Sequence, residues 1–197
     1  MKRLLLACCL LFGLPASAQD GPPFVLDALS ITSLVVPPPW VAEGSVEAQS
    51  EVINQQGRAQ NGNDFFRWHS IPKGQTFTDW SHLYSVTAER PLTGDLQLYA
   101  NGAINNLVEG CEGGAVQFSE TEQDTTRLFI VFCPQERARP GTGQVAFYNL
   151  TMARDTLVKN VLRLRVPHFS LDEGLPSESE ATLRQGLRRV ASMQLFY

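Results

Sequence analysis

Beyond its first 18 residues, the sequence lacks any apolar run approaching the roughly 20 residues that cross a bilayer as a helix. It also lacks concentrated basic charge, because its 16 lysines and arginines are scattered among 20 acidic residues. Proteins that bind nucleic acid need a basic surface that neutralises phosphates. The two absences predict a protein that does not span a membrane and does not bind nucleic acid.

Motifs for catalysis and metal binding are equally scarce. The three histidines, His69, His82 and His168, lie on separate segments, and no two have the close spacing of a zinc site. Gly44-Ser45 lacks the second glycine of a nucleophile elbow. We therefore expect no metal and no cofactor, and the sequence favours a binding protein over an enzyme.

The start of the chain carries an export pattern. Lys2 and Arg3 precede the apolar stretch Leu4–Leu14, and a run of small residues then ends at Ala18. This is the charge, length and cleavage pattern that signal peptidase recognises. It predicts a signal peptide over residues 1–18, cleaved after Ala18, and a periplasmic or secreted protein.

The cysteines support a disulfide. Cys8 and Cys9 belong to the predicted leader, which leaves the pair Cys111 and Cys133. An even pair in an oxidising compartment forms a structural bridge by default. A Cys111–Cys133 bridge would stabilise the fold by about 3 kcal/mol in the chain-entropy model. It would also remove the two thiols that could act as nucleophiles.

Periodicity predicts the fold. Residues 19–44 form a proline-rich lead-in, and residues 45–197 have the length of one domain. Apolar alternation and apolar runs predict strands at 65–71, 76–88, 115–118, 128–132, 145–152 and 157–166. Three- and four-residue spacing predicts a helix over 92–108, and a capping box at Ser177–Glu180 begins a second helix. This order favours an α+β fold, a mostly antiparallel twisted sheet with two helices packed on one face, with an all-β barrel as the alternative.

An aromatic strip is one candidate ligand site. Alternation along the strand over 76–88 places His82 between Trp80 and Tyr84 on the same face. Such a strip can stack a sugar or an apolar ligand, which would make the protein a carrier. It can equally pack beneath a helix as part of the core.

A small hydrolase centred on His82, Asp79 and His69 is another hypothesis. Ser81 is excluded as its nucleophile, because neighbours on a strand point to opposite faces. No second carboxylate is singled out by spacing. The histidines and Asp79 are therefore the whole of the catalytic hypothesis.

Cationic side chains follow one face of the last predicted strand. Lys159, Arg163 and Arg165 alternate with apolar residues over 157–166. The row could meet an acidic partner or an anionic lipid surface, or it could be a solvated face. With the leader, it favours an exported domain that binds a protein or a cell-envelope component through an exposed sheet face or edge.

The stretch from Phe66 to Ser81, FRWHSIPKGQTFTDWS, resembles a segment of small uncharacterised exported proteins of Gram-negative bacteria. Those proteins have a P-x-G-(Q/E) turn followed by an (N/D)-W-(S/T) strand start, and cysteines around an apolar strand further on. The resemblance implies a periplasmic address and brings no known activity. The turn itself follows from the chemistry of proline and glycine.

Overall fold

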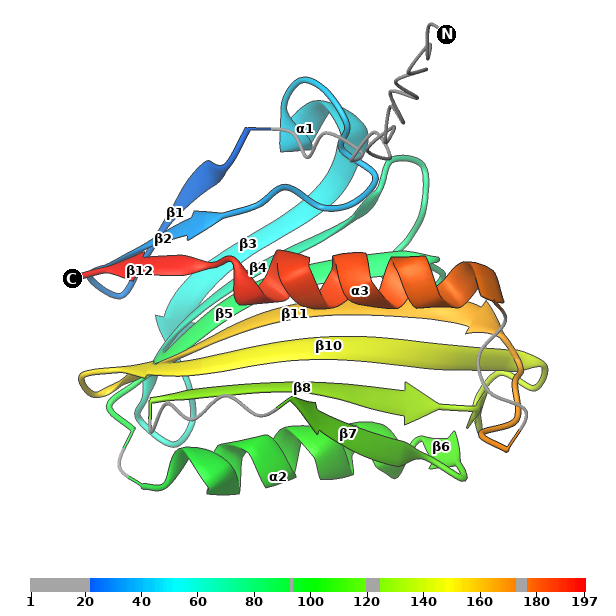
Figure 1. Ribbon diagram of the computed structural model, residues 1–197. Coiled ribbons are helices and arrows are strands. Elements are labelled where there is room, and N and C mark those ends of the chain that lie inside the picture. The colour runs from blue at the N-terminus through cyan, green and yellow to red at the C-terminus, as the bar shows by residue number, and fades with distance from the viewer. Residues whose placement is uncertain (1–21, 93, 120–124, 173–176) are drawn as a thin grey trace, which may run out of the picture.

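The computed structural model describes residues 22–92, 94–119, 125–172 and 177–197, and for 115–119 and 177–182 it describes the backbone alone. The chain is mostly β, with 51% strand and 17% helix. Figure 1 shows one large sheet, a small sheet formed by both ends of the described chain, and helices on either side of the large sheet. The predicted leader lies outside the described residues.

Seven strands make the large sheet, in the order β3-β4-β5-β11-β10-β8-β7, with every neighbouring pair antiparallel. The bounds are β3 Ser50–Arg58, β4 Asp64–Pro72, β5 His82–Arg90, β7 Ala115–Ser119, β8 Thr126–Cys133, β10 Thr142–Ala153 and β11 Thr156–Pro167. The long hairpin of β10 and β11 turns at Arg154, whose φ is 57°. This hairpin forms the middle of the sheet.

Two small sheets complete the fold. Strands β1 (Phe24–Ala28), β2 (Ile31–Val35) and β12 (Gln194–Phe196) pair in that order. Strands β6 (Cys111–Glu112) and β9 (Gln135–Glu136) pair with each other. Residues 22–44, expected as an extended lead-in, thus contain a hairpin whose apolar side chains join the core.

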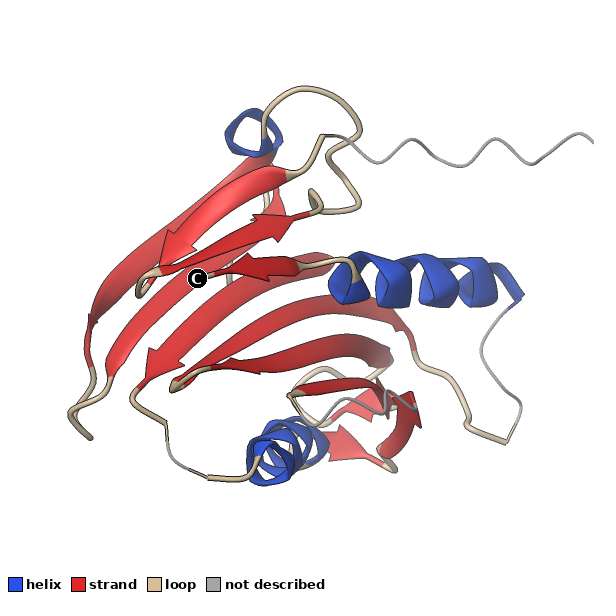
Figure 2. Ribbon diagram, turned by 60° about the vertical axis from the view of Figure 1, so that its left-hand side comes forward, coloured by secondary structure: helices blue, strands red, loops and turns tan. Residues whose placement is uncertain are grey.

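The helices lie on opposite faces of the large sheet (Figure 2). They are α1 (Val46–Gln49), α2 (Leu96–Val108) and α3 (Ser177–Ala191). Asp95 caps α2 by accepting a hydrogen bond of 2.8 Å from the Gln97 amide, which satisfies one free donor of the first turn. The predicted capping box of α3 falls on side chains outside the described residues. Within the described ranges, no helix has both the length and the apolar character that crossing a membrane demands.

The predicted α+β class, with two helices on one face, is wrong. The two helices pack on opposite faces, as neighbouring residues of β10 show. Phe147 packs in the cluster that contains α3, whereas Ala146 and Tyr148 pack in the cluster that contains α2. The strand content was underestimated because the polar stretch 50–58 is an edge strand, where few apolar side chains are needed. The antiparallel sheet and the disulfide are confirmed.

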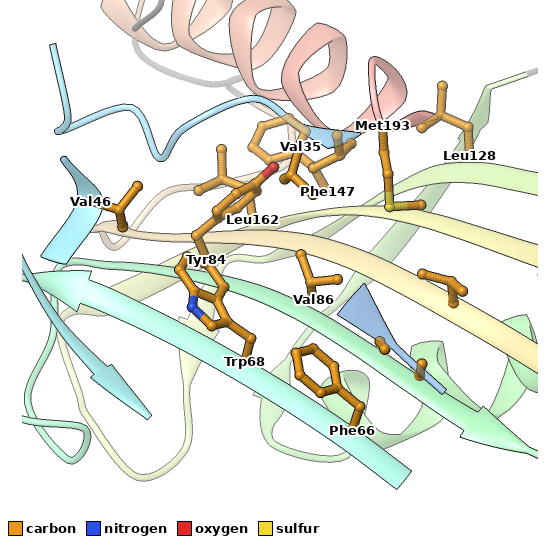
Figure 3. Close-up of a cluster of buried hydrophobic side chains, with 14 of the residues drawn as sticks. Val35, Val46, Phe66, Trp68, Tyr84, Val86, Leu128, Phe147, Leu162 and Met193 are labelled. Atoms are coloured by element: carbon orange, nitrogen blue, oxygen red, sulfur yellow. The ribbon is translucent and has the colours of Figure 1, made fainter. Parts of the chain in front are cut away.

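The larger core lies on the face of the sheet that carries α3, which we call the α3 face. Figure 3 shows side chains of β4, β5 and β11, among them Trp68, Tyr84 and Leu162, meeting Val35 of β2 and Phe147 of β10. Helix α3 approaches so closely that a Cβ at Gly186 would lie 2.7 Å from the Phe147 ring. The glycine therefore permits this packing, since the ring is fully buried.

Two buried asparagines anchor α3 to the sheet. Asn149 and Asn160 face each other across β10 and β11. Their side-chain amides donate to the Val190 carbonyl at 2.9 and 3.3 Å. That carbonyl belongs to the last turn of the helix, where the chain supplies no intrahelical partner. The pair thereby satisfies the helix end and fixes its position.

The opposite face, which we call the α2 face, has a smaller core. Phe129 and Tyr148 stack there with ring centroids 4.8 Å apart, beneath buried residues of α2. Cys111 and Cys133 are bonded, with Cα atoms 5.5 Å apart, so the disulfide prediction is confirmed. The bridge joins β6, which follows α2 in the chain, to the end of β8. Helix α2 packs on β8 and β10, which lie toward one edge of the sheet.

Candidate functional site

A row of three polar side chains crosses the α2 face beyond α2. Arg67 of β4 pairs with Thr87 of β5, which pairs in turn with Lys159 of β11. Residues paired in register lie on the same face of a sheet, and neighbouring strands are about 4.8 Å apart. The fold therefore sets a hydroxyl between two cations.

Strand alternation explains why Lys159 lies on this face. Its neighbours Val158 and Asn160 are fully buried on the α3 face, so the lysine points the other way. On its own face it lies between Leu157 and Val161, which belong to the core under α2. The lysine stem thus borders apolar surface, and its side chain is half-buried.

The row lines a cavity of about 320 Å³. The remaining lining residues are Ala59, Phe65, Phe66, His69, Ala88 and Glu89. Arg67 lies over the Phe65 ring, with its Cζ 4.8 Å from the ring centroid. Volumes of this order are typical of small-ligand sites. The cavity combines one apolar wall with a polar floor.

Two polar groups of this floor have no hydrogen-bond or ion-pair partner in the described chain. Among the described residues, the structure contains no hydrogen bond or ion pair to the Lys159 ammonium group. The Thr87 hydroxyl is buried and also without a hydrogen-bond partner in the described chain. A buried polar atom left unpaired is destabilising, and native proteins retain few of them.

The cations raise one another's electrostatic energy. Burial lowers the pKa of Lys159, the carboxylate of Glu89 acts against this, and Arg67 lowers it further. Burial also lowers the pKa of His69, and the charges of Arg67 and Lys159 add to the effect. Lys159 and His69 are therefore harder to protonate than the same side chains in water.

Glu89 and His69 are both held in place by neighbours. The Glu89 Oε1 atom accepts hydrogen bonds from the side-chain amides of Asn61 and Asn63, at 3.3 and 3.0 Å. His69 Nδ1 lies 2.8 Å from the Ser85 hydroxyl. The cavity walls are therefore held by hydrogen bonds, whereas the Lys159 ammonium group and the buried Thr87 hydroxyl have no hydrogen-bond partner in the described chain.

The far end of the predicted cationic row is built differently. Arg165 donates to Glu136 at 3.3 Å and to the Trp80 carbonyl at 2.8 Å, and its guanidinium lies 3.9 Å from the centroid of the Trp80 ring. Arg163 donates to Gln144 at 3.0 Å, with its Cζ 5.4 Å from the same ring. The alternation that placed the three cations on one face is correct, but the face is half-buried at these positions instead of solvated.

The aromatic strip does not form. Strand β5 begins at His82, and Thr76–Asp79 is a turn, so Trp80 precedes the alternation that was assumed for it. Trp80 packs under the arginines of β11, while Tyr84 is fully buried on the α3 face. His82 packs edge-on against Trp40, with ring centroids 5.9 Å apart. None of the three presents an open stacking surface. Tyr84 and Trp80 are buried, as the alternative of a strip packed into the core requires.

The residues of the hydrolase hypothesis are not brought together. His69 lies on the α2 face and His82 on the α3 face, as their pairings with Ser85 and Leu164 show. Asp79 is exposed and forms an ion pair of 2.7 Å with Arg139. His69, His82 and Asp79 therefore do not form a common site.

The exclusion of Ser81 as a partner of His82 is wrong. The Ser81 hydroxyl lies 2.9 Å from His82 Nδ1. This contact is possible because Ser81 precedes the strand, where neighbouring side chains need not point apart. Gln75 engages the same serine, accepting from its amide at 2.7 Å. Burial lowers the pKa of His82.

Metal binding has no support in the described part of the chain. No group of three His, Cys, Asp or Glu side chains there is close enough to hold a metal ion. Comparison with known proteins finds no protein family and no curated protein that matches this chain.

Sequence reasoning singled out Lys159 and His69 but missed Arg67 and Thr87. Arg67 is the only cation in the strand over 64–72 that faces the same side as His69, and alternation alone gives that much. What the sequence does not reveal is that β4, β5 and β11 are neighbours with Thr87 in the middle. That register joins residues about 90 positions apart in the chain.

Proposed function

We propose that the protein is a binding domain that receives an acidic group of its ligand in the cavity formed by Arg67, Thr87 and Lys159. The observation that carries this proposal is the half-buried ammonium group of Lys159, which borders apolar surface and has no hydrogen bond or ion pair within the described residues. Such a group lowers the stability of the free protein, and an anion would satisfy it.

The predicted export signal indicates the compartment in which the protein would meet its ligand. An exported domain with a cavity for an anion suits a ligand of the cell envelope or of the space around it. The mildly acidic composition, with a net charge of −4, argues against general attraction to polyanions. Recognition would therefore depend on the local cavity and not on the charge of the whole surface.

The lysine content permits a direct test. The sequence has three lysines, of which Lys2 lies in the predicted leader, so the exported form retains Lys73 and Lys159. Isotope-labelled methyl groups placed on the lysine amines would give separate NMR signals for these two. Lys73 is an internal control, since it is exposed and lies 3.4 Å from Glu51 in an ion pair.

The exported form would be titrated with inorganic phosphate, sulfate, succinate and a short polyglutamate peptide. We expect at least one of them to shift the Lys159 signal in a saturable way and to leave the Lys73 signal in place. Arg67→Gln should weaken that response, because it removes the second cation of the row. If no anion moves Lys159 more than Lys73, the proposed function is wrong.

A further inference from the structure

The hydrogen-bond donors around the cavity are arranged to surround one group. The unpartnered Thr87 hydroxyl lies in the middle of the row, and the side chains of Arg67 and Lys159 start one strand away on either side. The starting points of the two cations are therefore roughly 10 Å apart. Both side chains are long enough to reach the space above Thr87 from opposite sides.

The charge of the cavity favours a dianion. Arg67 and Lys159 contribute two positive charges, and His69 lies on the neighbouring row of the same face. Glu89 is the one carboxylate among the residues that line the cavity; it accepts hydrogen bonds from two asparagine amides, and its charge partly offsets that of Lys159. A carboxylate ligand would neutralise one of the two cations, whereas a group with two negative charges would neutralise both.

We propose that the cavity takes a phosphoryl group, as carried by a phosphate monoester or a phosphomonoester lipid headgroup. This inference rests on the proposed function and names its ligand class. A phosphoryl group carries close to two negative charges at neutral pH and offers three strong acceptor oxygens. Those oxygens match the guanidinium of Arg67, the hydroxyl of Thr87 and the ammonium group of Lys159.

The size of the cavity is consistent with an ester and exceeds what a free ion needs. At about 320 Å³ it leaves space beside the phosphoryl position for the group that carries it. The Phe65 ring, which already lies against the Arg67 guanidinium, lines part of that space. The carried group would then contact an aromatic surface while the phosphoryl oxygens contact the row.

Affinity measurements by calorimetry at pH 8 test the ligand class. Inorganic phosphate and glycerol phosphate should bind at least tenfold more tightly than acetate, because a second charge is neutralised, and more tightly than succinate, whose two charges lie on separate carboxylates. Thr87→Val keeps the branched shape of the side chain and should lower phosphate affinity about tenfold, the effect of one hydrogen bond to a charged group. Lys159→Met should lower it more, and Lys73→Met should leave it unchanged.

Two further arms separate the sources of the phosphoryl group. Binding to glycerol phosphate alone would assign the site to a soluble ester, and additional binding to vesicles of phosphatidic acid in phosphatidylcholine would assign it to a lipid headgroup. Either result supports the phosphoryl proposal. Succinate binding at least as tightly as phosphate would overturn it while leaving the proposed function intact, and the absence of binding by any anion would overturn both.

Discussion

Arg165 and Lys159 lie on the same face of β11, and their surroundings differ. The protein provides Arg165 with a carboxylate, a carbonyl and an aromatic ring, all within 4 Å. Lys159 has no hydrogen bond or ion pair within the described chain, and its stem borders the core under α2. A buried cation with partners holds the fold together, whereas one without a hydrogen bond or ion pair costs stability and points to a ligand.

The largest change in stability should come from removing Arg165, the cation of the β11 face that has partners. Arg165→Met leaves the Glu136 carboxylate, which is 14% exposed, without its cation, and should lower the free energy of unfolding by about 3 to 5 kcal/mol. Urea denaturation of the variant measures this. The matched control is Arg139→Met, which breaks an ion pair with the exposed Asp79 and should cost below about 1 kcal/mol. Equal losses in the two variants would remove the structural role assigned to Arg165.

Removing the disulfide should separate stability from binding. The double substitution Cys111→Ala/Cys133→Ala should lower the free energy of unfolding by about 3 kcal/mol, because the unfolded chain gains the freedom of a loop with a sequence separation of 22. Phosphate affinity should not change, since the cavity is formed on β4, β5 and β11. Calorimetry on the folded variant checks this, and a parallel fall in affinity would mean that the cavity depends on the packing of α2 against β8.

The face on which the β11 cations lie could be predicted from the sequence, but their burial could not. Alternation correctly placed Lys159, Arg163 and Arg165 on a common face, because the side-chain period of a strand is local. It could not show that the face is half-buried. At Arg163 and Arg165 the burial arises from Trp80, which reaches them only because the chain turns at Thr76–Asp79 before β5 begins.

The fold class failed for a related reason. The apolar run over 128–132 and the stripe of α2 are local signals, and the structure has β8 and α2 at those places. The polar strand β3 and the hairpin of β1 and β2 carry weak local signals, since they lie at the edge or in a small sheet. Which face each helix covers is decided by long-range packing, such as the contact of Gly186 with Phe147.

Removing Lys159 should change the stability in the opposite direction to removing Arg165. Lys159→Met replaces an unpartnered, half-buried ammonium group with an apolar side chain of similar length, and should raise the free energy of unfolding by about 1 kcal/mol. Lys73→Met, at an exposed site, should change it by less than about 0.5 kcal/mol. Urea denaturation without added anions measures both. A destabilised Lys159→Met variant would show that the lysine supports the fold.

The smallest effect concerns pH and reports on the cavity through His69. Burial, Arg67 and Lys159 lower the pKa of His69 in the folded protein, so below about pH 6.5 the unfolded chain takes up its proton first. The stabilisation that His69 gives is therefore present above pH 6.5 and is lost as the pH falls toward its folded pKa. His69→Gln should flatten that part of the stability curve.

An NMR titration of the histidine ring protons isolates the same effect. Sulfate, which keeps two negative charges across this range, should raise the pKa of His69 toward its ordinary value by neutralising the neighbouring cations. Lys159→Met should raise it without any anion and should weaken the response to sulfate. His82 is the control, because its pKa is lowered by burial and no cation contributes to that shift. If sulfate moves His82 as much as His69, the anion does not bind beside Lys159, and the two ends of the β11 face would no longer differ in function.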